Sequence, residues 1–165
     1  MTLLDAAAAD PAPLIALLRA RGETVATAES LTAGLVTAVL TSVPGASAVV
    51  RGGLVVYATD LKTRLAGVDA ALLAAHGAVH PEVARQLAEG ARDRCGADWG
   101  IGLTGVAGPD PQDGVAPGTV HIAVTGRNSS LGRTLQVGGG REAVRQASVT
   151  TAIMLLSSVI IGPTG

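Results

Sequence analysis

The chain has no phenylalanine and contains one tryptophan, one tyrosine and one cysteine among its 165 residues. A lone cysteine excludes an internal disulfide and suits a reducing compartment, so we expect a cytoplasmic protein. The scarcity of aromatic side chains removes the surfaces on which nucleic-acid bases stack. Charged residues make up only 15%, and the Lys and Arg residues are scattered, so nucleic acid is not an expected partner.

Long apolar runs are also scarce. The last one, Val149 to Ile161, is free of charge but shorter than the about 20 residues that a membrane-spanning helix needs. We therefore expect a terminal helix packed in a core, and no membrane partner. Near the start, Asp5 and Asp10 interrupt the apolar stretch and no basic segment precedes it, so no signal peptide is expected.

Hydrophobic residues make up 48% of the chain, enough for one domain over residues 1–165 with a core of Ala, Val, Leu and Ile. Apolar patterns and turn residues alternate regularly along it. They predict strands at 24–28, 52–57, 98–104, 119–125 and 131–137, and helices at 13–21, 30–43, 61–66, 69–75, 81–94 and 142–161. The second strand is apolar throughout and is expected to be buried on both faces. This order predicts an α/β fold with a mixed sheet covered by helices on both faces.

Ser30 stands where the first strand turns into a helix, at the expected N-cap position. A side chain there faces unpaired backbone N–H groups and the positive end of the helix dipole. That environment suits a nucleophile whose reaction develops an oxyanion. An ordinary helix-capping serine has the same sequence pattern, so both interpretations stay open.

Three strand ends carry polar or flexible residues: Ser30 follows the first strand, Tyr57 ends the second, and Thr104-Gly105 ends the third. If these strands are parallel neighbours, their ends meet on one rim, where ligands bind in α/β sheets. Lys62 follows Tyr57 by five residues, and a desolvated lysine can remove the proton of a serine. The tyrosine would relay the proton or hold the lysine. A solvated Lys62 and a water-exposed Tyr57 hydroxyl are the alternative.

The segment Gly100-Ile-Gly102-Leu-Thr-Gly105 matches a dinucleotide-binding pattern, but its glycines lie inside a strand and prolines follow. Glycine within a strand more often indicates that another backbone approaches closely. The loop over residues 104–113 has backbone N–H groups suited to an anion.

Arg141 and Arg145 follow three glycines and share one face of the last helix, which suits a phosphate, although two solvated arginines would show the same spacing. His76, His80 and His121 have no carboxylate cluster beside them, so we expect no metal and no cofactor.

These motifs, in this order, resemble the CinA C-terminal domain family, which includes nicotinamide-nucleotide amidases. The matching stretches are Ala28 to Gly34, Gly52-Gly53 through Tyr57, Lys62 to Val68, Thr104 to Pro109, Pro117 to Val120, and Arg141 to Arg145. The resemblance implies a three-layer α/β/α sandwich around a five-stranded mixed sheet. It also implies hydrolysis of the carboxamide of nicotinamide mononucleotide to nicotinate mononucleotide and ammonia, as a step of pyridine nucleotide salvage.

Carried over from the family, Ser30 would be the nucleophile, while Lys62 with Tyr57 would activate it and protonate the departing ammonia. The substrate, a small nucleotide, would be contacted by residues on the strand ends, the loop and the last helix: Thr32, Thr104, Gly105, Ala107, Gly108, Arg141 and Arg145. Backbone amides after Ser30 would hold the oxyanion, and one of the two arginines would meet the phosphate.

Four places depart from the family pattern. Ala33 stands where a glycine is common, the stretch around Thr59 lacks the usual Ser-Asn pair, His80 replaces a common serine, and Gly140 stands where an aspartate usually precedes the arginine. Two other functions remain open. One is a nucleotide-binding or protein-interaction module without turnover, and the other is a serine-lysine amidohydrolase of a different small amide. The apolar last helix also makes a homo-oligomer plausible.

Overall fold

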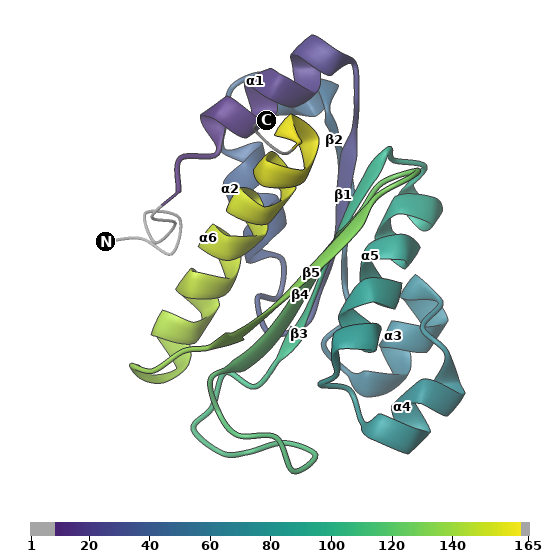
Figure 1. The fold of residues 1–165 in the computed structure, drawn as a ribbon, viewed down its shortest axis with the longest axis vertical. Helices are drawn as coiled ribbons and strands as arrows, with labels where there is room; N and C mark the ends of the chain where they lie inside the picture. The colour runs from purple at the N-terminus through teal and green to yellow at the C-terminus, as the bar shows by residue number, and fades with distance from the viewer. Residues whose placement is uncertain (1–8, 163–165) are drawn as a thin grey trace.

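The structure is a computed structural model in which residues 9–162 are described. Five strands form one sheet in the order β2-β1-β3-β4-β5, with β1 in parallel pairing with both β2 and β3 (Figure 1). The later strands pair antiparallel, so the predicted mixed sheet is confirmed. The strands are β1 (Val25–Glu29), β2 (Val50–Val55), β3 (Trp99–Gly105), β4 (Thr119–Thr125) and β5 (Ser130–Gln136).

Helices cover both faces of the sheet, as the alternation of elements predicts. One face carries α1 (Ala12–Arg21), α2 (Leu35–Thr41) and α6 (Gly140–Ile161), and the other carries α3 (Thr59–Ala66), α4 (Ala70–His76) and α5 (Pro81–Cys95) (Figure 1). A short 3-10 helix, η1 (Ala46–Ala48), leads into β2. The three-layer α/β/α architecture is therefore confirmed.

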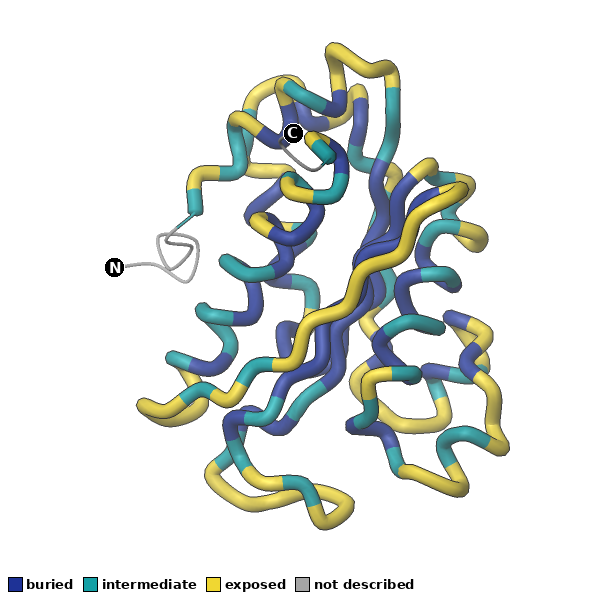
Figure 2. Tube along the Cα trace, viewed as in Figure 1, coloured by how far each residue is buried: buried dark blue, intermediate teal, exposed yellow. Residues whose placement is uncertain are grey.

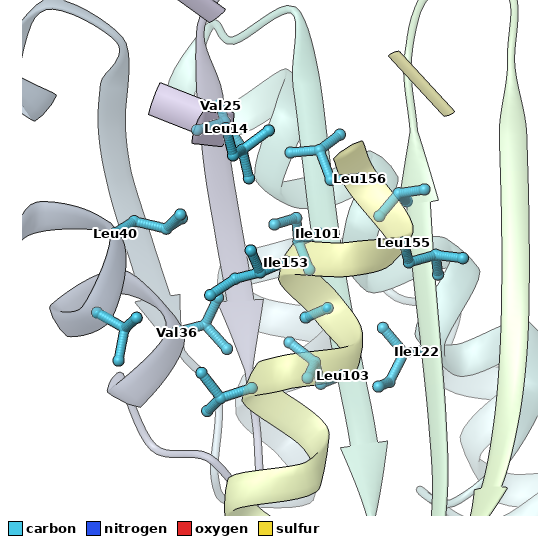
Figure 3. Close-up of a cluster of buried hydrophobic side chains, with 14 of the residues drawn as sticks. Leu14, Val25, Val36, Leu40, Ile101, Leu103, Ile122, Ile153, Leu155 and Leu156 are labelled. Carbon is cyan, nitrogen blue, oxygen red and sulfur yellow. The ribbon is translucent and has the colours of Figure 1, made fainter. Parts of the chain in front are cut away.

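The two faces of the sheet are packed in different ways. On the face of α6, branched side chains such as Val36, Ile101 and Ile153 interlock between helix and strands (Figure 3). On the opposite face, a side chain at Gly100 or Gly102 would collide with the backbone of α5. The strand glycines thus allow a helix to approach closely, as expected, and serve no dinucleotide.

The strand β2 lies at one edge of the sheet, and the expectation that both of its faces are buried is wrong. Leu54 and Val56 pack against the layer of α3 and α5, but Val55 on the opposite face is 46% exposed. An apolar sequence does not distinguish a central strand from an edge strand, because coverage depends on where the neighbouring helices lie. The other edge, β5, is also exposed along most of its length (Figure 2).

Helix α6 is 22 residues long, which exceeds the apolar run recognised in the sequence. By length and hydropathy it meets the requirement for a membrane-spanning helix. Its buried side chains, among them Val144, Val149, Ile153 and Leu156, pack in the core beside the sheet. The expectation of a core-packed terminal helix is confirmed. The expectation that the chain has no signal peptide rests partly on residues 1–8, which lie outside the described residues.

Candidate active site

The carboxyl ends of the three parallel strands meet on one rim, as predicted. The N–H of Ser30 donates to the Leu103 carbonyl of β3 at 3.2 Å, and the N–H of Val56 donates to the Glu29 carbonyl of β1 at 2.8 Å. The end of β1 is therefore tied to both of its neighbours. Because β1 is the middle strand of the three, Ser30 lies between the ends of β2 and β3.

Ser30 does not cap a helix, which corrects the expectation of a helix over residues 30–43. Helix α2 begins at Leu35, and Gly34 is its N-cap residue. The residues between form a turn in which Ala33 has a φ of 50° and Gly34 a φ of 95°. The left-handed conformation explains why a glycine is favoured at position 33 in the family, since an alanine is strained there.

Capping of α2 falls to Glu29, a residue that the sequence analysis missed. Its side chain is fully buried and accepts five hydrogen bonds, three from backbone N–H groups and two from hydroxyls. The backbone donors belong to Gly34, Val36 and Thr37, and the hydroxyl donors belong to Thr27 and Thr37. A carboxylate inside a buried strand was the available signal, because a buried charge needs partners.

Lys62 is the only lysine of the chain, and it is buried to 1% exposure on the inner side of α3. Its Nζ lies 3.1 Å from the Ser30 Oγ, 2.8 Å from the Val56 carbonyl oxygen and 3.3 Å from the Tyr57 carbonyl oxygen. Burial lowers the pKa of Lys62 from 10.5 to about 8, against an opposing pull from the Asp113 carboxylate. Lys62 is therefore buried beside the serine and not solvated, which was the alternative that its sequence position left open.

The three neighbours of the Lys62 Nζ match the geometry that a general base needs. A neutral amine has two N–H bonds, which the Val56 and Tyr57 carbonyls accept, and its lone pair then points at the Ser30 hydroxyl. Once protonated, the ammonium can donate to all three oxygens. The same amine can therefore take a proton from Ser30 and hold it without moving.

The Tyr57 phenol lies apart from this pair. Its side chain is 58% exposed, and its hydroxyl accepts a hydrogen bond from the Arg141 Nη2 at 3.2 Å. The Arg141 Nη1 donates to the Gly108 carbonyl at 3.1 Å. Only the backbone carbonyl of Tyr57 contacts Lys62. In this structure Tyr57 thus helps to hold the lysine through its main chain, while its ring borders the opening of the site.

The two arginines of α6 have different surroundings. Arg141 is exposed at the first turn, whereas Arg145 is half-buried and donates through Nε to the Leu31 carbonyl at 3.0 Å. Its Nη2 also donates to the Thr32 carbonyl at 3.3 Å. Arg145 is therefore bonded to the turn behind Ser30, and Arg141 is the arginine that faces solvent at the rim.

A hollow with a volume of about 310 Å³ opens over Ser30. Gly105, Ala107, Gly108 and Arg141 line it as expected, and Thr59, Asp110 and Gln112 were not anticipated. Thr104 and Thr32 do not line it. The Thr104 hydroxyl is buried and donates to the Ala78 carbonyl at 2.6 Å, and the fully buried Thr32 Oγ1 has no partner among the described residues.

The three histidines are engaged with other parts of the protein. The rings of His76 and His80 stack with centroids 4.6 Å apart, and the His80 Nδ1 accepts the Glu82 N–H at the start of α5. The His121 ring is hydrogen-bonded to Thr134 at 2.8 Å. Within residues 9–162, no group of three or more His, Cys, Asp or Glu side chains is arranged to hold a metal ion.

Comparison with known proteins identifies relatives of this chain. The family profile described as the CinA C-terminal domain matches residues 10–160. A CinA-like protein of Frankia casuarinae is 44% identical over 90% of the chain, and one from Anaeromyxobacter sp. (strain K) is 50% identical over 88% of it. The chain spans about a third of the length of these relatives, 34% and 36% respectively.

Solved structures of proteins with similar names share the fold of this chain. The competence/damage inducible protein CihA of Agrobacterium tumefaciens is 34% identical with a TM-score of 0.88, and the match covers 97% of this chain and 96% of that one. A CinA superfamily protein of Escherichia coli is 26% identical with a TM-score of 0.87, over 98% of this chain and 91% of that one.

Proposed function

Because the chain belongs to the CinA C-terminal domain family, we propose that it hydrolyses the carboxamide of nicotinamide mononucleotide to nicotinate mononucleotide and ammonia. The observation that carries the proposal is the 3.1 Å contact between the Ser30 Oγ and the Lys62 Nζ at the floor of an open hollow. Nucleophile and base within hydrogen-bond reach are the signature of covalent acyl transfer. We place the reaction in the cytoplasm, as a step of pyridine nucleotide salvage.

The first half of the reaction acylates the enzyme. The Ser30 Oγ attacks the carboxamide carbon while its proton passes to the Lys62 Nζ. The carbonyl oxygen becomes an oxyanion, which the backbone N–H groups that follow Ser30 stabilise. When the intermediate collapses, the C–N bond breaks and Lys62 returns the proton to the departing nitrogen, which leaves as ammonia.

The second half frees the enzyme. The acyl group is now an ester of Ser30, and a water molecule attacks its carbonyl carbon as Lys62 takes one proton from that water. Breaking the ester C–O bond returns the proton to the Ser30 Oγ and releases nicotinate mononucleotide as its carboxylic acid, which loses its remaining proton to the solvent. The pKa of Lys62 of about 8 suits a group that must take and return a proton near neutral pH.

The phosphate end of the substrate is assigned to Arg141. Its guanidinium is exposed on the rim of the hollow, at the N-terminal turn of α6, where the helix dipole also favours an anion. Its present partners, the Tyr57 hydroxyl and the Gly108 carbonyl, are neutral groups at 3.2 Å and 3.1 Å. A phosphate offers a charged acceptor in their place.

The test is ammonia release from nicotinamide mononucleotide by the purified protein. We expect the wild type to release ammonia, and Ser30→Ala and Lys62→Met to lose that activity by about four orders of magnitude, as other enzymes do when nucleophile or base is removed. Methionine keeps most of the length of the lysine side chain without its amine. Ser129→Ala, in the exposed hairpin between β4 and β5, is the matched serine control and should retain full activity.

Two outcomes would change the proposal. If Ser30→Ala retained ammonia release, Ser30 would not be the nucleophile. If the wild type bound the mononucleotide in calorimetry without releasing ammonia, the protein would be a nucleotide-binding module. Release from plain nicotinamide at an equal rate would indicate an amidase for other small amides.

A further inference from the structure

We propose that Arg145 is a positioning residue for the proposed hydrolysis: it holds the turn after Ser30 so that the N–H groups of Leu31 and Thr32 form the oxyanion hole. The inference rests on the proposed function, and it separates the roles of two arginines that the sequence places on one face of α6. The inference rests on the acceptors that the backbone N–H groups of the turn have, and on the two N–H groups that have none within residues 9–162.

The turn leaves two N–H groups free. The Ser30 N–H donates to the Leu103 carbonyl, the Ala33 N–H to the Ser30 carbonyl, and the Gly34 N–H to the Glu29 carboxylate. Between them, the N–H groups of Leu31 and Thr32 have no acceptor among the described residues. Backbone donors in a folded protein are nearly always paired, so two free donors beside a nucleophile point to a ligand atom that carries negative charge.

Arg145 acts on the carbonyl side of one of these two peptides. Its Nε donates to the Leu31 carbonyl, which belongs to the same peptide group as the Thr32 N–H. A guanidinium on the oxygen of a peptide draws electron density away from its N–H and strengthens that N–H as a donor. The second contact, from Nη2 to the Thr32 carbonyl, fixes the next peptide plane as well.

Glu29 holds the later part of the same turn. Its carboxylate binds the N–H groups of Gly34, Val36 and Thr37, which would otherwise be the free donors at the start of α2. The helix therefore begins at Leu35, and the strained conformation of Ala33 is retained. The carboxylate on the N–H groups of residues 34, 36 and 37 and the guanidinium on the carbonyls of residues 31–32 leave the turn little freedom to point its donors away.

Arg141 is the matched comparison, because it lies one helical turn earlier on α6. It donates to the Tyr57 hydroxyl and the Gly108 carbonyl at the mouth of the hollow, and within residues 9–162 it makes no hydrogen bond to the Ser30 turn. Loss of a rim cation weakens substrate binding, which raises KM. Loss of Arg145 weakens an interaction made in the transition state, which lowers kcat.

The experiment compares Arg145→Gln, Arg145→Lys and Arg141→Gln in ammonia release from nicotinamide mononucleotide. We expect Arg145→Gln to lower kcat by about thirtyfold with KM within about twofold, because two donors are loosened and neither is removed. Arg145→Lys should recover part of kcat, since its ammonium reaches one carbonyl but not both. Arg141→Gln should raise KM by about tenfold and change kcat less.

A second measurement does not depend on the substrate. A fluorophosphonate that carries no nucleotide reacts with an activated serine, and its phosphoryl oxygen occupies the oxyanion hole. We expect mass spectrometry to show labelling of Ser30 about tenfold slower in Arg145→Gln than in the wild type, and at the wild-type rate in Arg133→Gln on the exposed β5 strand.

The outcomes separate this inference from the proposed function. Wild-type protein that releases no ammonia would overturn the hydrolysis, whereas slow labelling in Arg145→Gln alone would still support the positioning role. An unchanged labelling rate and an unchanged kcat in Arg145→Gln would overturn the positioning role and leave the hydrolysis intact. Thermal unfolding shows whether Arg145→Gln folds. If it does not, the labelling rate and kcat of Arg145→Lys decide the same question.

Discussion

The two ends of the parallel strands each carry a hollow, and the comparison shows what distinguishes a functional site from a surface depression. The hollow at the carboxyl ends, over Ser30, has a volume of about 310 Å³. The hollow at the amino ends, lined by Glu23, Asp98, Trp99 and Arg127 among others, is larger at about 440 Å³. Size therefore does not identify the functional site.

The polar groups at the amino ends bind one another. Glu23 pairs with Arg21 at 3.0 Å and accepts the Trp99 indole N–H at 2.7 Å. Asp98 accepts both the N–H and the hydroxyl of Thr24, at 2.8 Å and 3.0 Å. Glu23, Asp98 and the Trp99 indole thus already have partners within the protein.

The carboxyl ends hold polar groups that lack such partners. Lys62 is buried with no carboxylate in contact, two backbone N–H groups are free beside Ser30, and the Thr32 hydroxyl is unpaired within residues 9–162. A lysine buried without an anionic partner and a buried hydroxyl without a hydrogen bond both oppose folding, because the loss of water around them is only partly repaid. Their concentration at one end of the sheet favours that end as the candidate site.

The comparison is tested most strongly by the pH dependence of catalysis. Lys62 must be neutral to accept the Ser30 proton, and burial lowers its pKa to about 8. We expect kcat/KM to be level above pH 8 and to fall about tenfold per unit below it, so that activity at pH 6 is about one hundredth of the maximum. A flat profile from pH 6 to 9 would mean that Lys62 is not the base.

The same lysine should affect stability in a predictable direction. Its pKa is about 8 in the folded protein and 10.5 when unfolded, so folding releases a proton between these values. The destabilisation is complete below pH 8 and disappears as the pH rises toward 10.5. The free energy of unfolding of the wild type, relative to Lys62→Met, should therefore rise by about 2 kcal/mol from pH 7.5 to 10 in urea titrations.

A substitution in the amino-end hollow is expected to have the smallest effect, and it serves as the control for activity. Glu23→Gln removes the charge that pairs with Arg21 and weakens the bond to the Trp99 indole. We expect a loss of about 1 kcal/mol in the free energy of unfolding, measured with urea, and unchanged ammonia release. A large loss of activity in this variant would mean that the two ends of the sheet are coupled.

Much of the fold follows from local patterns. Asp69 caps α4 with a hydrogen bond to the Ala71 N–H at 2.8 Å, and Pro81 opens α5, as the sequence indicates. Val83, Leu87 and Ala91 form the buried stripe of α5, as their helical spacing predicts. These features depend on residues close together in the chain, so the sequence is sufficient for them.

The site was predicted less completely because its contacts are distant in sequence. Ser30 and Lys62 were singled out by their places after two strands and then by the family resemblance, but the engagement of Arg145 with a turn more than a hundred residues earlier was not predicted. The capping role of Glu29 was assigned to Ser30, since both stand before an apolar helical pattern. Only the three-dimensional path of the turn shows which side chain reaches the N–H groups of α2.

The middle position of β1 also has a consequence during synthesis. A nascent chain that has emerged through α5 already contains Ser30, Tyr57 and Lys62, yet it lacks β3, whose Leu103 carbonyl holds the Ser30 N–H. It also lacks Arg145 on α6, which donates to the Leu31 carbonyl. A nascent chain of that length therefore carries Ser30 and Lys62 without two of the contacts that hold the Ser30 turn.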